Sequence, residues 1–220
     1  GKRALILDTG HPDLCGFEAL DGVQKTLRIP WSNIEVFLSH FHDDHDGNLL
    51  YCVQKGASKL YSGPTQIDSR TLIDNFLVLS SSADLKSDSA SSFIRLVAAG
   101  KKAQTCTQGS RIELHGGETL SLAGYHFDVL LTPGHTSNHL CLLDKSKKIF
   151  FAGDHICDAP PGCMQYAIND HLVARYLESL AQLKELNLQA VYMCHHNPLR
   201  GSFEINRFIS LIEGRYETLV

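Results

Sequence analysis

The amino-acid sequence predicts a mixed α/β fold for this chain of 220 residues. Short apolar runs, typical of buried strands, alternate with longer amphipathic segments, typical of helices that pack on a sheet. With 43% hydrophobic and 20% charged residues, the chain has enough apolar material to bury a sizeable core. We therefore expect a single domain over residues 1–220, interrupted by one helical insert.

The first half of the chain alternates strands and helices. The predicted strands cover residues 3–7, 34–38 and 59–61. The predicted helices cover residues 17–27 and a segment that begins at Leu49. Each of these strands is followed by a polar or glycine-containing segment, which is typical of strand-to-helix connections in α/β proteins.

The second half is richer in strands. Predicted strands cover residues 111–114, 119–122, 125–131, 140–143 and 148–151. Turn residues at Gly116-Gly117 and Ala123-Gly124 separate the first of them, so we expect antiparallel pairing. A helix at residues 172–186, with Asp170 as a candidate cap, is followed by a strand at 190–193 and a helix at 203–219.

Residues 64–110 fit neither strand pattern and predict an inserted helical hairpin. Its two helical pieces cover residues 65–79 and 90–101, and a joint rich in Ser and Asp separates them. Apolar side chains such as Phe76 and Phe93 are candidates to line the wall of a binding pocket. Packing or dimer formation is the alternative role of the insert.

Charge and composition exclude several classes of partner. A formal net charge of −4 gives no electrostatic reason to expect nucleic acid. No apolar run has the length of a membrane span, and the chain does not open on a secretory signal. The seven cysteines are an odd number without a repeated spacing, which is typical of reduced thiols in a cytoplasmic protein.

Residues 39–48, SHFHDDHDGN, concentrate imidazole and carboxylate groups directly after a predicted strand. His40 and His42 are two residues apart, so in an extended chain both side chains leave on the same face. Asp44 and His45 follow at once. Such groups suit zinc or iron and can leave one coordination position open to water. A solvated turn is the alternative, because Asp, Asn and Gly are common turn residues.

Three later strands also end in polar residues. The side chains are those of His135, Asp154 and either His195 or His196. A single His or Asp at a strand end is more often a cap or turn residue than a ligand. Four polar clusters at four strand ends nevertheless favour one shared site, because loops at one sheet edge converge in space.

These motifs resemble those of the metallo-β-lactamase superfamily of hydrolases. The matching segments are Asp8-Thr9-Gly10, His40-x-His42-x-Asp44-His45-x-Gly47-Asn48, Thr132-Pro133-Gly134-His135-Thr136, Gly153-Asp154 and a His after the last strand. They occur in the order of the family and cover nearly the whole chain. The resemblance implies a four-layer αββα sandwich with two metal ions at one edge.

The resemblance also implies the ligands of both metal ions. His40, His42 and His135 would bind the first ion; Asp44, His45 and His195 would bind the second; Asp154 would bridge the two. His195 is preferred to His196 because relatives usually end this strand in a Gly-His pair. Asp44 is in addition a candidate to accept the proton of the attacking water. His139 and His155 are candidates to orient the ligands, with ordinary polar packing as the alternative. Cys157, Cys163 and Cys194 are expected to be core thiols.

A dinuclear centre can hold a hydroxide that is nucleophilic near neutral pH. Because residue 154 is a carboxylate, the chain is most similar to the glyoxalase II, lactonase and general acyl-hydrolase branch, which implies cleavage of a thioester or ester. The alternatives are a non-haem iron oxidoreductase of the same fold and a phosphodiesterase or nuclease; the lack of a basic stripe disfavours the latter. We expect two divalent metal ions, with zinc as the preferred metal and iron or manganese as alternatives. We also expect a small-molecule substrate and no membrane partner, and the chain has the option of forming a homodimer.

Overall fold

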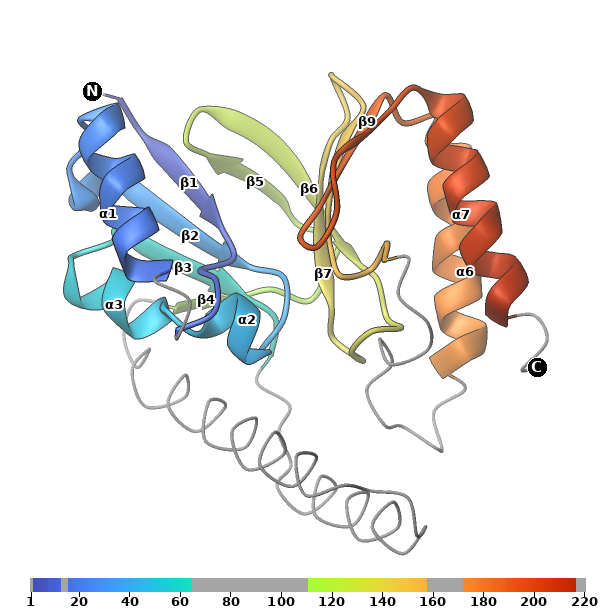
Figure 1. Cartoon of the computed structure of the whole chain (residues 1–220), viewed down its shortest axis with the longest axis horizontal. Helices are drawn as coiled ribbons and strands as arrows, with labels where there is room; N and C mark the ends of the chain where they lie inside the picture. Colours follow the sequence, from blue (N-terminus) through green and yellow to red (C-terminus); the bar gives the residue numbers. More distant parts are fainter. Residues whose placement is uncertain (1, 13–15, 65–110, 158–171, 217–220) are drawn as a thin grey trace, which may run out of the picture. The chain divides into compact units, whose positions relative to one another are not determined.

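The computed structural model describes residues 2–12, 16–64, 111–157 and 172–216, and Figure 1 shows its helices and strands with their labels. The chain divides into two compact units, Gly1–Glu113 and Leu114–Val220. In the described part of each unit, helices pack against one β-sheet. The predicted insert, except for Pro64, lies outside the described residues, and the single-domain organisation stays a prediction.

The first unit contains a four-stranded sheet in the order β1-β2-β3-β4, and all its neighbouring strands are parallel. The strands are β1 (Ala4–Leu7), β2 (Ile34–Leu38), β3 (Lys59–Ser62) and β4 (Arg111–Glu113). The helices are α1 (Gly16–Leu27), a 3-10 turn (Trp31–Asn33), α2 (Asp43–Asp46) and α3 (Leu49–Gln54). The alternation of strand and helix predicted from the sequence is therefore confirmed for this unit.

Strand β2 is the centre of the first unit. All five of its residues are buried, as expected for a parallel strand with neighbours on both sides. The one charged residue among them, Glu35, forms an ion pair with Arg3 at 2.8 Å. Its side chains Val36 and Leu38 pack with Leu49 and Cys52 of α3 and with Leu60 of β3. Partly buried side chains of α1 and of the 3-10 turn extend this cluster, so α1 and α3 cover the same face of the sheet.

The parallel pairing of β1 with β2 determines where the polar motifs of this unit meet. Leu7 is paired with Phe37, so the two strands end side by side. The backbone N–H of Asp8 donates to the carbonyl of Phe37 at 2.9 Å, which extends the pairing by one residue. The Asp-Thr-Gly segment and the histidine-rich segment therefore leave the sheet at the same edge.

The second unit contains a six-stranded sheet in the order β10-β9-β8-β7-β6-β5. The strands are β5 (Thr119–Leu122), β6 (Tyr125–Leu131), β7 (Leu140–Asp144), β8 (Ile149–Gly153), β9 (Ala190–Met193) and β10 (Leu199–Arg200). Strands β5 to β8 form an antiparallel meander, as the turn residues predict. Strand β9 is parallel to β8, and β10 is antiparallel to β9.

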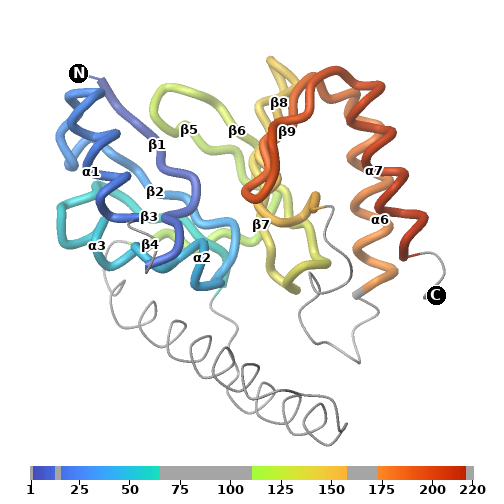
Figure 2. The backbone as a smooth tube through the Cα atoms, viewed as in Figure 1, coloured from blue at the N-terminus to red at the C-terminus, as the bar shows by residue number. Residues whose placement is uncertain are grey.

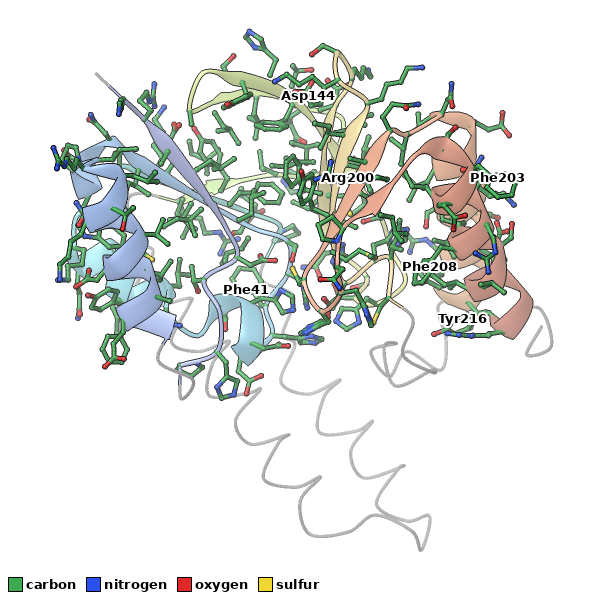
Figure 3. The ribbon with its side chains drawn as sticks, turned by 45° about the horizontal axis from the view of Figure 1, so that its top comes forward. Phe41, Asp144, Arg200, Phe203, Phe208 and Tyr216 are labelled. Carbon is green, nitrogen blue, oxygen red and sulfur yellow. The ribbon has the colours of Figure 1, made fainter. Side chains whose placement is uncertain are left out.

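Helices α6 (Leu172–Glu185) and α7 (Ser202–Tyr216) lie side by side in the second unit (Figures 1 and 2). Their apolar stripes pack with one face of the sheet in a core that includes Phe150 and Val191 of the strands. Figure 3 shows the side chains, with Phe208 and Tyr216 labelled on α7. Among the described helices, the structure contains none with both the length and the apolar composition of a membrane-spanning segment.

One prediction about strands is wrong, and one strand was not predicted. Residues 111–114 were expected to pair antiparallel with the later strands, but β4 is parallel to β3, with Arg111 opposite Leu60. Tertiary contacts explain this pairing, because the Arg111 guanidinium donates to the carbonyl of Gly63 at 3.0 Å and lies over the ring of Phe41. Strand β10 was not predicted, because two residues are too few to show an alternating pattern.

Candidate metal centre

His40 and His42 bring two ring nitrogens together at the end of β2. His42 has an extended backbone, with φ −116° and ψ 154°, so the two side chains leave on one face as the spacing predicts. Nε2 of His40 is 2.9 Å from Nδ1 of His42, and the rings meet edge to face. Two nitrogens bound to one zinc ion at about 2.0–2.1 Å are themselves on the order of 3 Å apart. The pair therefore fits a shared ion.

The short helix α2 places Asp44 and His45 beside this pair. The backbone N–H groups of His45 and Asp46 donate to the carbonyl of His42 at 2.9 and 2.8 Å, which closes a helical turn after the extended segment. Oδ2 of Asp44 then lies 3.6 Å from Nε2 of His45. The His45 ring lies 4.1 Å from that of His40, measured between centroids. All four ligand candidates of the first unit are thus gathered in one cluster.

Asp8 fixes the orientation of His45. Its Oδ1 accepts from the backbone N–H of Ser39 at 2.7 Å, while Oδ2 accepts from the Ser39 hydroxyl at 2.8 Å and from Nδ1 of His45 at 2.9 Å. A carboxylate at Nδ1 holds the imidazole proton there, which leaves the lone pair of Nε2 for a ligand. Asp8 adopts the left-handed conformation, with φ 57°, to make these contacts.

Ser39 links Asp8 to His40 and thereby fixes the tautomer of the His40 ring. The Ser39 oxygen lies 2.9 Å from Nδ1 of His40, and its only proton goes to the carboxylate of Asp8, the stronger acceptor. Nδ1 of His40 therefore donates to Ser39, and Nε2 carries the lone pair. One carboxylate thus sets the tautomers of two ligand candidates. Sequence reasoning missed Ser39, because a serine at a strand end is an ordinary turn residue.

Thr9 and Asn48 connect the end of β1 to α2. The backbone N–H and the hydroxyl of Thr9 donate to the carbonyl of His45 at 2.6 and 2.8 Å. The backbone N–H of Asn48 donates to the Thr9 hydroxyl, and its side-chain amide donates to the carbonyls of Thr9 and Gly10. A Cβ at Gly47 would overlap Pro12, so glycine allows this close approach. These contacts explain why the Asp8-Thr9-Gly10 segment contains a threonine and why the histidine-rich segment ends in Gly47 and Asn48.

In the second unit, Asp154 lies between two imidazoles. Its Oδ2 is 3.5 Å from Nε2 of His135, and its Oδ1 is 3.3 Å from Nε2 of His195. Asp154 and His135 are buried, whereas the His195 side chain is 46% exposed. Each carboxylate oxygen thus faces a different imidazole nitrogen, which is the arrangement that a bridging carboxylate needs.

A sharp turn after β8 carries Asp154 out of the sheet. The pairing of β8 with β9 is irregular between Phe151 and Gly153, and Gly153 has φ 50°. The carbonyl of Gly153 accepts from the backbone N–H of Cys194 at 3.3 Å. This bond links the segment that precedes Asp154 to the segment that precedes His195, because β8 and β9 are parallel neighbours.

His155 anchors the same turn to α6. Its Nε2 lies 2.9 Å from the Ser179 hydroxyl, and its backbone carbonyl accepts from the Tyr176 hydroxyl at 2.8 Å. Burial lowers the pKa of His155 to about 3, with a smaller contribution in the same direction from the neighbouring His135. His155 is therefore neutral at physiological pH and acts in packing and hydrogen bonding around Asp154.

The thiols only partly follow the expectation. Cys157 is buried, as predicted for a core thiol, whereas Cys194 is exposed, so that prediction is wrong for Cys194. The reason is position: Cys194 follows the last residue of β9, where the chain leaves the sheet. Cys163 lies outside the described residues.

Gly134 is required by the packing of the loop that carries His135. A Cβ at this position would overlap the ring of Tyr176, which cannot retreat because it is in contact with the rings of His155 and Tyr216. We expect Gly134→Ala to destabilise the protein by about 1–3 kcal/mol, the range for overpacking. Denaturant unfolding measures this, with Gly22→Ala in α1 as the control, where a Cβ meets nothing within 4 Å. Equal stability of the two variants would contradict the argument.

Comparisons with known proteins identify the family to which the chain belongs. The sequence profile described as Metallo-beta-lactamase superfamily matches residues 1–195. Lactamase-like protein adaB of Aspergillus niger is 24% identical over 195 residues, which cover 89% of this chain and 47% of that protein. The chain thus spans about half the length of the curated relatives it matches.

Two solved structures share the fold. A metallo-beta-lactamase family protein from Thermus thermophilus has a TM-score of 0.74 and 18% identity, over 96% of this chain and 70% of that one. A beta-lactamase domain protein from Burkholderia ambifaria has a TM-score of 0.67 and 17% identity, over 97% and 64%. The predicted α/β fold of the metallo-β-lactamase type is confirmed, and because the family profile matches most of its length, the chain belongs to the metallo-β-lactamase superfamily.

Proposed function

We propose that the chain is a metal-dependent hydrolase with a dinuclear centre. The observation that carries the proposal is the position of Asp154, with one carboxylate oxygen toward His135 and the other toward His195. Members of this superfamily are typically metal-dependent hydrolases, and each unit holds a cluster of His and Asp side chains of the types that bind divalent metals.

The donor set fits zinc, iron or manganese. It consists of imidazole nitrogens and carboxylate oxygens without a thiolate, which suits borderline and harder divalent ions. We assign His40, His42 and His135 to the first ion, Asp44, His45 and His195 to the second, and Asp154 to both. When bound, two such ions would polarise a carbonyl oxygen and make a water molecule nucleophilic near neutral pH.

The protein itself orients the ligands and accepts a proton. Asp8 and Ser39 hold the ligand tautomers of His45 and His40. Asp44 is 35% exposed at its side chain and lies 3.6 Å from His45, so it is open to solvent on one side. We assign Asp44 as the acceptor of the proton that the attacking water releases.

We propose a thioester or carboxylic ester as the substrate. Support comes from the carboxylate at residue 154 and from the net charge of −4, which disfavours the polyanionic backbone of nucleic acids. The test is a panel of thioesters, lactones and phosphodiesters, offered to protein reconstituted with zinc, manganese or iron. We expect the protein to hydrolyse thioesters or lactones. This activity should be lost when a chelator removes the metal and should return when the metal is added back. Cleavage of phosphodiesters alone, or oxygen consumption by the iron form without hydrolysis, would contradict the proposal and favour one of the alternatives.

Two neighbouring histidines after β9 offer a sharp test of the ligand assignment. Nε2 of His195 lies 3.3 Å from Asp154, so we expect His195→Ala to weaken binding of one metal ion and to reduce hydrolysis strongly. His196→Ala is the matched control and should keep wild-type metal content. Elemental analysis of both variants decides the point. The reverse result would move the assignment to His196, and wild-type metal content in both variants would show that this segment supplies no ligand.

A further inference from the structure

His139 lies in the loop between β6 and β7 and is fully buried. Its backbone carbonyl accepts from the N–H of Thr132 at 2.9 Å, which closes the loop that contains His135. The centroid of the His139 ring is 6.0 Å from that of His135 and 6.0 Å from that of His155. The side chain is thus next to the two segments of the second unit that carry His135 and Asp154.

The hydrogen bonds of this ring define its tautomer. The backbone N–H of Asp154 donates to Nε2 at 3.2 Å, so Nε2 is an acceptor and carries no proton. In a neutral imidazole the proton is then on Nδ1, which faces the Thr132 hydroxyl at 3.0 Å. The Thr132 hydroxyl is in turn within 3.3 Å of the His139 carbonyl, and it lies 3.1 Å from the Cys141 sulfur.

We infer that His139 is a positioning residue for Asp154, which it holds through the backbone N–H. This inference rests on the proposed function, because it concerns the same centre. The preceding carbonyl, of Gly153, is held by Cys194, and the N–H of Asp154 is held by His139. Both sides of the peptide group that leads into Asp154 are therefore fixed, and with them the direction of its Cα–Cβ bond.

The consequence for metal binding follows from the geometry. The two carboxylate oxygens face His135 and His195 at 3.5 and 3.3 Å, and a rotation of the 153–154 peptide would turn both oxygens away together. Loss of a partner that orients a metal ligand typically weakens metal affinity by about 10–100-fold. We therefore expect a loss of this size when His139 no longer accepts the hydrogen bond, with all proposed ligands still present.

The experiment compares three variants of the whole chain. His139→Leu removes the acceptor and keeps a side chain of similar bulk. His139→Gln retains an acceptor, because its amide oxygen can reach the place of Nε2. Ile209→Val, a substitution in the fully buried core of α7, is the control for loss of packing outside the loops that carry the candidate ligands. For each protein we would measure zinc affinity by competition with a chelator, and hydrogen exchange of the Asp154 amide in the metal-free state by NMR.

The inference predicts a metal affinity about 10–100-fold weaker for His139→Leu, substantial recovery for His139→Gln, and wild-type affinity for Ile209→Val. It also predicts that the Asp154 amide exchanges faster in His139→Leu than in the wild type, by a larger factor than neighbouring amides do. Unchanged affinity and exchange in His139→Leu would overturn it, as would equal losses in the Leu and Gln variants. If the wild type binds none of zinc, manganese and iron, the proposed function fails, while amide exchange still decides whether His139 holds Asp154.

Discussion

Asp154→Ala should lower the occupancy of both metal positions together and should abolish most of the hydrolysis. Each oxygen of Asp154 faces a different imidazole, so removal of this carboxylate takes a ligand from both proposed ions. The loss of metal affinity should exceed the roughly 10–100-fold that removal of an orienting partner causes. Elemental analysis after reconstitution and dialysis, together with kcat/KM for the best ester substrate, measures the effect.

Asp144→Ala is the matched control for this substitution. Asp144, labelled in Figure 3, is also a buried carboxylate at the end of a strand in the second unit. It accepts from the Ser146 hydroxyl and from the backbone N–H of Lys147, so it stabilises the turn between β7 and β8. Asp144→Ala should reduce stability and leave metal content unchanged. A variant Asp154→Ala that keeps one fully occupied metal position would show that the carboxylate is not shared.

Asp8→Asn should weaken metal binding through His45 and His40 although Asp8 is not a proposed ligand. The amide replaces an acceptor oxygen by an NH₂ group, which cannot accept from Ser39 and His45 as the carboxylate does. We expect metal affinity to fall by about 10–100-fold and the free energy of unfolding by about 1–3 kcal/mol, the cost of leaving a buried polar group without its partner. Chelator competition and denaturant unfolding measure the two quantities.

Two further variants separate the branches of this network. Ser39→Ala interrupts only the connection to His40, so its effect on metal affinity should be smaller than that of Asp8→Asn. Asp21→Asn, which changes a carboxylate paired with Lys55 in the same unit, should leave metal affinity as it is, since surface ion pairs contribute little. If Asp8→Asn binds metal like the wild type, Asp8 does not control the ligand tautomers.

Much of the fold follows from local sequence patterns. Strands β2, β5, β6 and β9 have the bounds that hydrophobic patterning predicts, because each is a run of apolar or alternating residues between turn signals. The partner of β4 could not be predicted, because three residues do not specify a register and the contacts of Arg111 decide the sheet to which it belongs.

The candidate ligands could be recognised because His and Asp side chains follow several strands of the chain. Of their orienting partners, His139 and His155 could be named from the sequence, whereas Ser39 and Thr132 could not. Ser39 and Thr132 are common in turns, and their hydrogen bonds to His40 and His139 depend on backbone geometry that no spacing in the sequence defines. The short helix α2 was likewise not predicted, since one helical turn over Asp43–Asp46 has no periodic apolar pattern.

The most direct test of the dinuclear centre is anomalous diffraction from crystals of the zinc-reconstituted chain, recorded on both sides of the zinc absorption edge. The account predicts about two anomalous peaks per chain, roughly 3.5–4 Å apart, with Asp154 in contact with both ions. Ligands should come from His40, His42 and the short helix α2 as well as from the loops after β6, β8 and β9. A single peak, or two peaks without Asp154 as a shared ligand, would contradict the account.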